Sequence, residues 1–281
     1  MFRYRFFLAA AVFPVLLWLR AGAADSGAFR FVILGDRTGE AQPGVYEQIW
    51  TELAAQKPAF VLSVGDTIQG ADDRTAESQW EQVEQTLSAW KRFPLYLTPG
   101  NHDIWSARSA QLFERYAGHP PHYSFDYGPA HFTILNNSQS DNLPAGELAF
   151  LDQDLRLHSR QTVRFIVSHR PSWLVDVIVN NPNFELQRIA KRYNAAYVIA
   201  GHVHELLHAE LDGVTYVSVP SAGGHLRGNG RYADGWFFGY TVVDIQGSSA
   251  AFQVREVGTP HGEGRTTPLS VWGKAGLRQS P

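Results

Sequence analysis

The chain has 281 residues, of which 44% are hydrophobic and 13% aromatic, and its formal net charge at pH 7 is -3. This supply of apolar residues is enough for the core of one large domain, and the charge excludes the broad basic surface that nucleic-acid-binding proteins use. The chain has no cysteine. That excludes a disulfide scaffold, a zinc-thiolate site, a cysteine nucleophile and an acylated cysteine.

The first residues have the order of a secretory signal peptide. Two arginines within the first five residues precede an apolar stretch from Phe6 to Leu19, and small residues follow at positions 21–24. The apolar stretch is shorter than the roughly 20 residues that cross a membrane. We therefore expect residues 1–24 to be a cleaved signal peptide, with export to the periplasm or the extracellular space and no stable membrane span after cleavage.

Short apolar runs rich in β-branched residues recur along the rest of the chain, as is typical of strands buried on both faces. Helical patterns at 44–57 and 77–91 separate the first three runs, which gives the order of a parallel α/β unit. Later runs at 239–246 and 251–257 follow short turns and indicate an antiparallel sheet. The other expected strands are residues 30–35, 59–65, 94–100, 131–136, 163–169, 196–202 and 215–221.

These elements predict an α/β fold, a four-layer α/β/β/α sandwich of two mixed β-sheets flanked by helices. The sequence places this domain at residues 28–258. Residues 259–281 are rich in Gly, Thr, Pro and Arg, a composition that favours a loosely ordered C-terminal tail.

The ends of five predicted strands carry side chains that can bind a metal ion or transfer a proton. Ligands bind outside the carboxyl ends of strands in open α/β sheets, so we expect these side chains to meet in one crevice. Each motif alone also has a structural explanation, such as an aspartate that caps a helix. The ordered set GD, GD, GNHD, H and GHVH is what indicates a site. Its residues are Asp36, Asp66, Asn101, His102, Asp103, His169, His202 and His204.

This ordered set resembles that of the calcineurin-like metallophosphoesterases, which include the purple acid phosphatases and related phosphodiesterases. The resemblance covers roughly residues 30 to 205. It implies two divalent or trivalent metal ions about 3.5 to 4 Å apart, and ligands without sulfur suit Mn, Fe, Zn or Co. The implied ligands are Asp66 bridging both ions, Asn101, His169 and His202 at one site, and Asp36 and His204 at the other.

The resemblance also implies hydrolysis of a phosphate mono- or diester by a metal-bound hydroxide. A phosphate ester is anionic and repels hydroxide, and two metal ions neutralise its oxygens while lowering the pKa of a bound water. His102 would give a proton to the leaving oxygen, and Asp103 would orient the His102 ring. The expected partner is a small-molecule, lipid or nucleotide phosphate ester.

The first motif departs from the family's pattern. Most members have Asp-x-His there, whereas this chain has Asp36, Arg37 and Thr38. Purple acid phosphatases compensate with a tyrosine at the place of Gln69. We therefore expect the first site to hold its metal less firmly. Two alternatives stay open: a mononuclear enzyme in which Arg37 supplies some of the missing charge, and a phosphate-binding protein without turnover. Candidate substrate contacts are Arg37, Thr38, Arg170 and His225.

Overall fold

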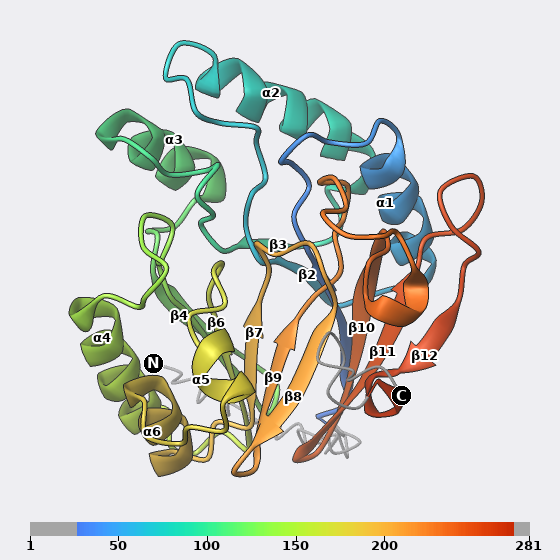
Figure 1. The fold of residues 1–281 in the computed structure, drawn as a ribbon. Coiled ribbons are helices and arrows are strands. Elements are labelled where there is room, and N and C mark those ends of the chain that lie inside the picture. The colour runs from blue at the N-terminus through green and yellow to red at the C-terminus, as the bar shows by residue number, and fades with distance from the viewer. Residues whose placement is uncertain (1–26, 273–281) are drawn as a thin grey trace, which may run out of the picture.

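The computed structural model describes residues 27–272, and in it two six-stranded sheets pack face to face (Figure 1). The strand orders are β12-β11-β10-β1-β2-β3 and β4-β5-β6-β7-β9-β8. The first sheet comprises β1 (Phe29–Leu34), β2 (Phe60–Ser63), β3 (Leu95–Leu97), β10 (Gly239–Gln246), β11 (Ser249–Glu256) and β12 (Thr266–Pro268). The second comprises β4 (Tyr123–Tyr127), β5 (Ala130–Ile134), β6 (Val163–Val167), β7 (Tyr197–Ala200), β8 (Leu207–Leu211) and β9 (Val214–Ser218).

Helices cover the outer face of each sheet. The first sheet is covered by α1 (Val45–Ala55) and α2 (Ala76–Thr86), with α3 (Ala107–Ala117) packed beside α2. The second is covered by α4 (Ala145–Leu157), α5 (Leu174–Ile178) and α6 (Glu185–Arg192). Three short 3-10 helices are η1 (Leu87–Trp90), η2 (Tyr232–Asp234) and η3 (Leu269–Val271). Both sheets contain parallel and antiparallel pairs, so the predicted four-layer fold is confirmed.

The continuous apolarity of β1 follows from burial on both of its faces. Phe31 belongs to the core between the sheets, whereas its neighbour Val32 belongs to the core under α1. Side chains alternate between the two faces of a strand, so a strand with two buried faces needs no polar residue along its length. Aromatic rings fill much of the space between the sheets. Phe31 and Phe60 stack at 5.0 Å, and Phe132 and Phe165 at 4.8 Å.

Parallel pairing brings the motifs to one edge of the molecule. In the first sheet β1 pairs with β2, and β2 with β3; in the second sheet β6 pairs with β7; all three pairs are parallel. The carboxyl ends of neighbouring parallel strands lie at the same edge. Each motif of the ordered set begins within three residues of the end of its strand, so the fold itself gathers them.

The predicted domain end at residue 258 is wrong. β12 pairs with β11, and the side chains of Leu269 and Trp272 are buried in the core between the sheets. The Gly- and Pro-rich composition suggested a loose tail. The pairing of β12 with β11 and the burial of Leu269 and Trp272 instead hold residues 259–272 against the domain. Residues 273–281 and the expected signal peptide at 1–24 lie outside the described residues.

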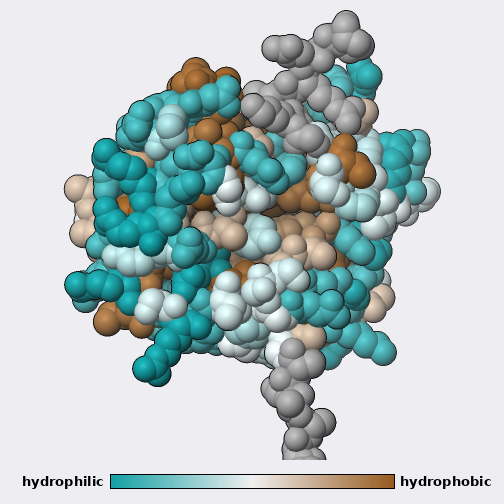
Figure 2. Space-filling view, turned by 90° about the horizontal axis from the view of Figure 1, so that it is seen from below, coloured by the Kyte–Doolittle hydropathy of each residue, from teal (hydrophilic) through white to brown (hydrophobic). Residues whose placement is uncertain are grey.

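The surface is polar in composition, with apolar groups scattered over it. On the underside, hydrophilic and hydrophobic residues are interspersed (Figure 2). Among residues 27–272, no helix is both long and apolar enough to cross a membrane.

Candidate metal centre

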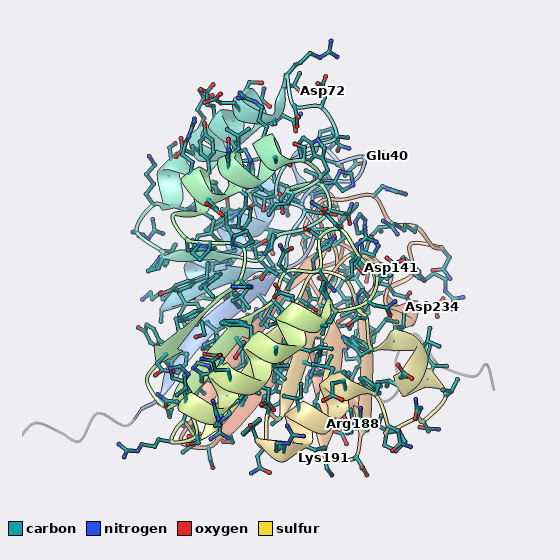
Figure 3. All side chains as sticks on the ribbon, turned by 90° about the vertical axis from the view of Figure 1, so that its left-hand side faces the viewer. Glu40, Asp72, Asp141, Arg188, Lys191 and Asp234 are labelled. Atoms are coloured by element: carbon teal, nitrogen blue, oxygen red, sulfur yellow. The ribbon has the colours of Figure 1, made fainter. Side chains whose placement is uncertain are left out.

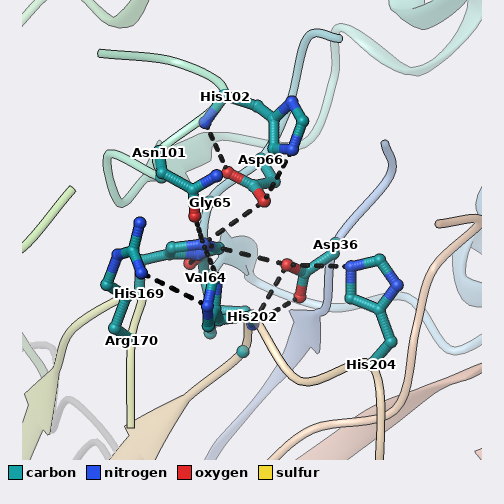
Figure 4. A network of polar contacts seen from close by, with 12 residues as sticks. Asp36, Val64, Gly65, Asp66, Asn101, His102, His169, Arg170, His202 and His204 are labelled. Carbon is teal, nitrogen blue, oxygen red and sulfur yellow. Dashed lines mark hydrogen bonds and ion pairs between the residues drawn. The ribbon is translucent and has the colours of Figure 1, made fainter. Parts of the chain in front are cut away.

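The candidate ligands come from five strand ends and lie together at one edge of the sheets (Figure 4). Their metal-binding atoms form two groups, and the atoms of each group lie within 4.8 Å of one another. Asp66 belongs to both groups, as a bridging ligand would. The groups are Asp66, His169 and His202, and Asp36, Asp66 and His204.

Atoms that offer electron pairs surround Nε2 of His169. Nδ1 of this ring lies 2.8 Å from the carbonyl oxygen of Val64, which can only accept, so Nδ1 carries the hydrogen. Nε2 lies 3.1 Å from the amide oxygen of Asn101, 3.3 Å from a carboxylate oxygen of Asp66 and 3.2 Å from Nδ1 of His202. Such a set of buried acceptors needs a proton or a metal cation among them.

A second unpaired nitrogen lies in the other group. Nδ1 of His204 donates to the carbonyl oxygen of His225 at 2.7 Å. Its Nε2 is buried, makes no hydrogen bond, and lies 3.4 Å from a carboxylate oxygen of Asp36. A lone pair that faces a carboxylate is repelled by it unless a cation lies between them. The donor set of this group therefore also fits a metal ion.

Two motif glycines are required by the close approach of the ligands. A Cβ atom on Gly100 would lie 2.2 Å from Oδ1 of Asp66, and one on Gly201 would lie 2.6 Å from Oδ2 of Asp36. Neither contact is possible without displacing a carboxylate. The glycine before the asparagine and the glycine before the histidine thus leave room for ligands that come from other strands.

Three candidate ligands have a backbone conformation that their residue types rarely adopt. Asp66, His202 and His204 have φ angles of 54°, 68° and 60°. Each such residue costs about 1 to 3 kcal/mol and persists where the surrounding structure holds it. The described residues include six other non-glycine positions with positive φ, but these three are all candidate ligands and lie together at one site.

The charges of the cluster favour a cation. Burial opposes ionisation of Asp66, but the charge on His169 outweighs it and holds the pKa of that carboxyl well below its usual range. Burial also opposes protonation of His169, yet the carboxylates of Asp66 and Asp36 raise its pKa to about 9. Burial, with the positive charges of His169 and Arg170, lowers the pKa of His202 to about 4. A neutral imidazole is the form that binds a metal.

His102 lies beside the cluster. Its amide N–H donates to Oδ1 of Asp66 at 2.9 Å, and its ring Nε2 lies 4.0 Å from the other oxygen of that carboxylate. Nδ1 lies 2.5 Å from the carbonyl oxygen of Gln69, which fixes the hydrogen on Nδ1. Nε2 is therefore free to exchange a proton with a group bound at the cluster.

Asp103 does not orient the His102 ring as expected. Its side chain is fully buried and accepts hydrogen bonds from the backbone N–H groups of Gly100, Thr67 and Ile68. Burial and the negative charge of Asp66 raise its pKa to about 6. Asp103 thus joins the loops after β2 and β3, and the contact with the ring comes from Gln69 instead.

The side chains of the two residues after Asp36 contact main-chain carbonyl groups of the second-motif loop. The Thr38 hydroxyl lies 2.8 Å from the carbonyl oxygen of Asp66 and 2.7 Å from that of Ile68. The Arg37 guanidinium donates to the carbonyl oxygen of Thr67 and lies over the ring of Tyr46. Both side chains thus hold the first-motif loop against the second-motif loop.

The other two candidate substrate contacts, Arg170 and His225, lie next to candidate metal ligands. Nη1 of Arg170 is 3.4 Å from Nε2 of His202 and pairs with Asp141 at 2.5 Å. The His225 ring faces the carbonyl oxygen of Gly39, and the main chain of His225 holds His204. Three acidic residues, Glu40, Asp141 and Asp234, project from the same side of the molecule (Figure 3), and each lies within 4.0 Å of a basic side chain.

Comparisons with known proteins identify the family of the chain. The family model for calcineurin-like phosphoesterase matches residues 29–206, from β1 through the last motif histidine. The chain belongs to the calcineurin-like phosphoesterase family. The resemblance inferred from the ordered motifs is thereby confirmed.

Several curated members of the family are similar in sequence. The rat serine/threonine-protein phosphatase CPPED1 is 27% identical over 53% of this chain and 54% of its own length. Purple acid phosphatase 23 of Arabidopsis thaliana is 25% identical over 54% of this chain and 42% of its own. The Escherichia coli 3',5'-cyclic adenosine monophosphate phosphodiesterase CpdA is 24% identical over 67% and 69%. The chain therefore spans about half of the length of CPPED1 and less than half of the length of purple acid phosphatase 23.

Solved structures of the family share the fold at low identity. The purple acid phosphatase PPD1 from yellow lupin superposes with a TM-score of 0.65 at 18% identity, covering 86% of this chain and 53% of that one. GAP50 of Plasmodium, described as the anchor in the inner membrane complex, gives 0.61 at 16% identity over 86% and 88%. At these identities the likeness concerns the fold alone.

Proposed function

We propose that this calcineurin-like phosphoesterase is an exported hydrolase of phosphate mono- or diesters with a dinuclear metal centre. The observation that carries the proposal is the position of Asp66, whose carboxylate belongs to both groups of ligand atoms. A carboxylate shared in this way supports two adjacent ions rather than one. The names of the relatives, two phosphatases and one phosphodiesterase, support either ester class.

The candidate ligands would form two metal sites. One ion would be held by Asp66, Asn101, His169 and His202, and the other by Asp66, Asp36 and His204. Bound there, two ions would neutralise phosphate oxygens and lower the pKa of a water molecule toward neutrality. The second set has fewer protein ligands, because Thr38 is bonded to main-chain carbonyls, so its ion would exchange more readily.

The chain's own groups would complete the reaction. His102 has its Nδ1 hydrogen fixed by Gln69 and its Nε2 beside Asp66, which suits proton donation to a leaving oxygen. Arg170 lies next to His202 and could hold a non-bridging phosphate oxygen, although its pairing with Asp141 must then loosen. Asp103 keeps the two loops in register.

Elemental analysis and hydrolysis together test this proposal. The purified protein, loaded with Mn²⁺, is expected to hold about two metal ions per chain and to hydrolyse 4-nitrophenyl phosphate or bis(4-nitrophenyl) phosphate. Asp66→Ala should abolish both the binding of two ions and the hydrolysis of these esters. One tightly bound ion with retained turnover would favour a mononuclear centre. Tight binding of inorganic phosphate without hydrolysis of either ester would instead indicate a phosphate-binding protein.

A further inference from the structure

An apolar stripe lies on the exposed side of α5. The inner face of this helix is buried through Val177, next to Trp173. Val175, Ile178 and the following Val179 are 73%, 44% and 64% exposed, and their spacing of i, i+3 and i+4 places them on one face. A surface helix normally has polar residues there. Among residues 27–272, half of the six exposed large hydrophobic side chains are these three.

A pocket connects Val175, the first residue of this stripe, with the metal centre. Its lining includes His202, Arg170 and Asp141, together with Leu174, Val175 and Asp176 of α5. Ile178 and Val179 do not belong to this lining. His202 is a candidate ligand, with Nδ1 toward His169 and Nε2 toward Arg170. A molecule in this pocket would therefore touch the outer side of a metal ligand and the apolar helix together.

The charges around the pocket narrow the class of molecule that fits. Two acidic side chains line the pocket, Asp141 and Asp176. Asp141 is 86% exposed at its side chain and already pairs with Arg170. Acidic groups in the lining disfavour ligands with several negative charges. Beyond the phosphate group, the pocket offers apolar contact and no additional cluster of cations among its lining residues.

We propose that the substrate is a phosphate ester whose organic part carries an alkyl chain or another apolar group, which lies along α5 and contacts Val175. This inference rests on the proposed phosphoesterase function and adds the substrate class to it. The shared chemistry is a phosphate next to a hydrocarbon, and it can belong to a soluble ester or to a lipid.

Binding of n-alkylphosphonates tests the inference without turnover. Calorimetry with the Mn²⁺-loaded protein and the series from methyl- to octylphosphonate should show affinity rising about twofold per methylene. Full burial of a methylene corresponds to about fourfold, and half of that free energy is expected on an open helix face. Affinity that does not change with chain length would overturn the inference.

Paired variants locate the effect. Val175→Asn should weaken octylphosphonate binding about tenfold and leave methylphosphonate unchanged, because it removes apolar contact without adding a charge. The control is Leu157→Asn, because Leu157 is 66% exposed at the far end of α4, near the start of β6, and we expect no change there. A chain-length dependence that survives in Val175→Asn would show that another surface binds the chain, and the inference would be wrong.

Hydrolysis assays separate this inference from the proposed function. If 4-nitrophenyl esters are hydrolysed but phosphonate affinity is independent of chain length, the function stands and the substrate class does not. If chain length matters but no ester is hydrolysed, the proposed function is wrong and the pocket binds alkyl phosphates without turnover. Phosphatidylcholine vesicles test a membrane contact: length-independent phosphonate binding, together with vesicle sedimentation that Val175→Asn abolishes, would make α5 a membrane contact and overturn the inference.

Discussion

The main-chain carbonyl oxygen of His225 accepts a hydrogen bond from Nδ1 of His204 at 2.7 Å. A loop after β9 thereby fixes the tautomer of a candidate ligand that follows β7. The lone pair on Nε2 is left facing Asp36, where a metal ion fits. The His225 side chain takes no part in this contact.

Metal content should therefore respond differently to two histidine substitutions. His204→Ala removes a ligand and should lower the content from about two ions per chain toward one. His225→Ala keeps the carbonyl group and should leave the content near that of the original protein. Elemental analysis after gel filtration measures both. Equal loss of metal from the two variants would contradict this account of the tautomer.

Gly100→Ala should inactivate the protein by displacing Asp66. The added Cβ would lie 2.2 Å from Oδ1 of Asp66 and 2.3 Å from its main-chain nitrogen, so one of the two loops must move. We expect at least a hundredfold loss of kcat/KM, since a shift of about 1 Å at a catalytic site has that effect. Gly146→Ala is the matched control, because nothing lies within 4 Å of its Cβ position. It should fold with stability unchanged or raised by less than about 1 kcal/mol.

The role of His102 can be tested by comparing how its removal affects esters with different leaving groups. His102→Ala should lower kcat for an alkyl or phenyl phosphate by about 10² to 10⁴. The loss should be much smaller with 4-nitrophenyl phosphate, whose leaving group needs no proton. Steady-state kinetics on both esters gives the comparison. Asp103→Asn should affect both esters alike, because Asp103 holds loop backbone rather than the ring. An equal loss for both esters in His102→Ala would contradict the proton-donor role.

A buried histidine outside the metal centre should make stability depend on pH. The His131 ring is fully buried, with Nδ1 2.6 Å from Asp126 and Nε2 2.8 Å from Asp154. Burial opposes its protonation, but the bonds to these carboxylates outweigh burial and raise its pKa above the usual value. The folded protein thus keeps this proton to higher pH than the unfolded chain. The resulting stabilisation is complete below the unfolded pKa of about 6.5 and is lost as pH rises through the folded pKa.

His131→Gln should remove that pH dependence and lower the free energy of unfolding at pH 6 by about 3 kcal/mol, because Asp154 loses its charged partner. Urea unfolding of the metal-free protein between pH 5 and 9 measures both effects. His122→Gln is the control, since His122 pairs with Glu147 at the surface and such pairs contribute less than about 1 kcal/mol. A pH profile that His131→Gln leaves unchanged would show that another group is responsible.

The sequence predicted the layers of the fold, and it predicted candidate metal ligands that the structure brings together, because both depend on local patterns. A strand buried on both faces must be apolar throughout, as at residues 31–34, and a parallel strand delivers the residue after it to a fixed edge. Asp36 and Asp66 therefore meet because β1 and β2 pair side by side. His202 follows β7 of the other sheet, and the packing of the two sheets brings it to them. The amphipathic spacing in α1 and α2 was visible for the same reason.

Contacts made by the main chain could not be predicted in this way. The carbonyl groups of Val64, Gln69 and His225 each fix an imidazole, and every residue type has such a carbonyl. Asp103 looked like the partner of His102 because it is adjacent in sequence, but its side chain turns toward backbone N–H groups that needed acceptors.

Burial likewise depends on the whole fold. The composition of residues 259–272 favours a loose tail, yet Trp272 lies in the core because the sheets leave a space that its ring fills. Val175 and Val177 are the same residue type two positions apart, and only the packing of α5 decides that one is exposed and the other buried. Local sequence patterns are thus enough to predict which residues could bind a metal ion and where strands end. The partners that orient those residues, and the apolar groups that face solvent, depend on contacts between segments far apart in the chain, so only the folded structure shows them.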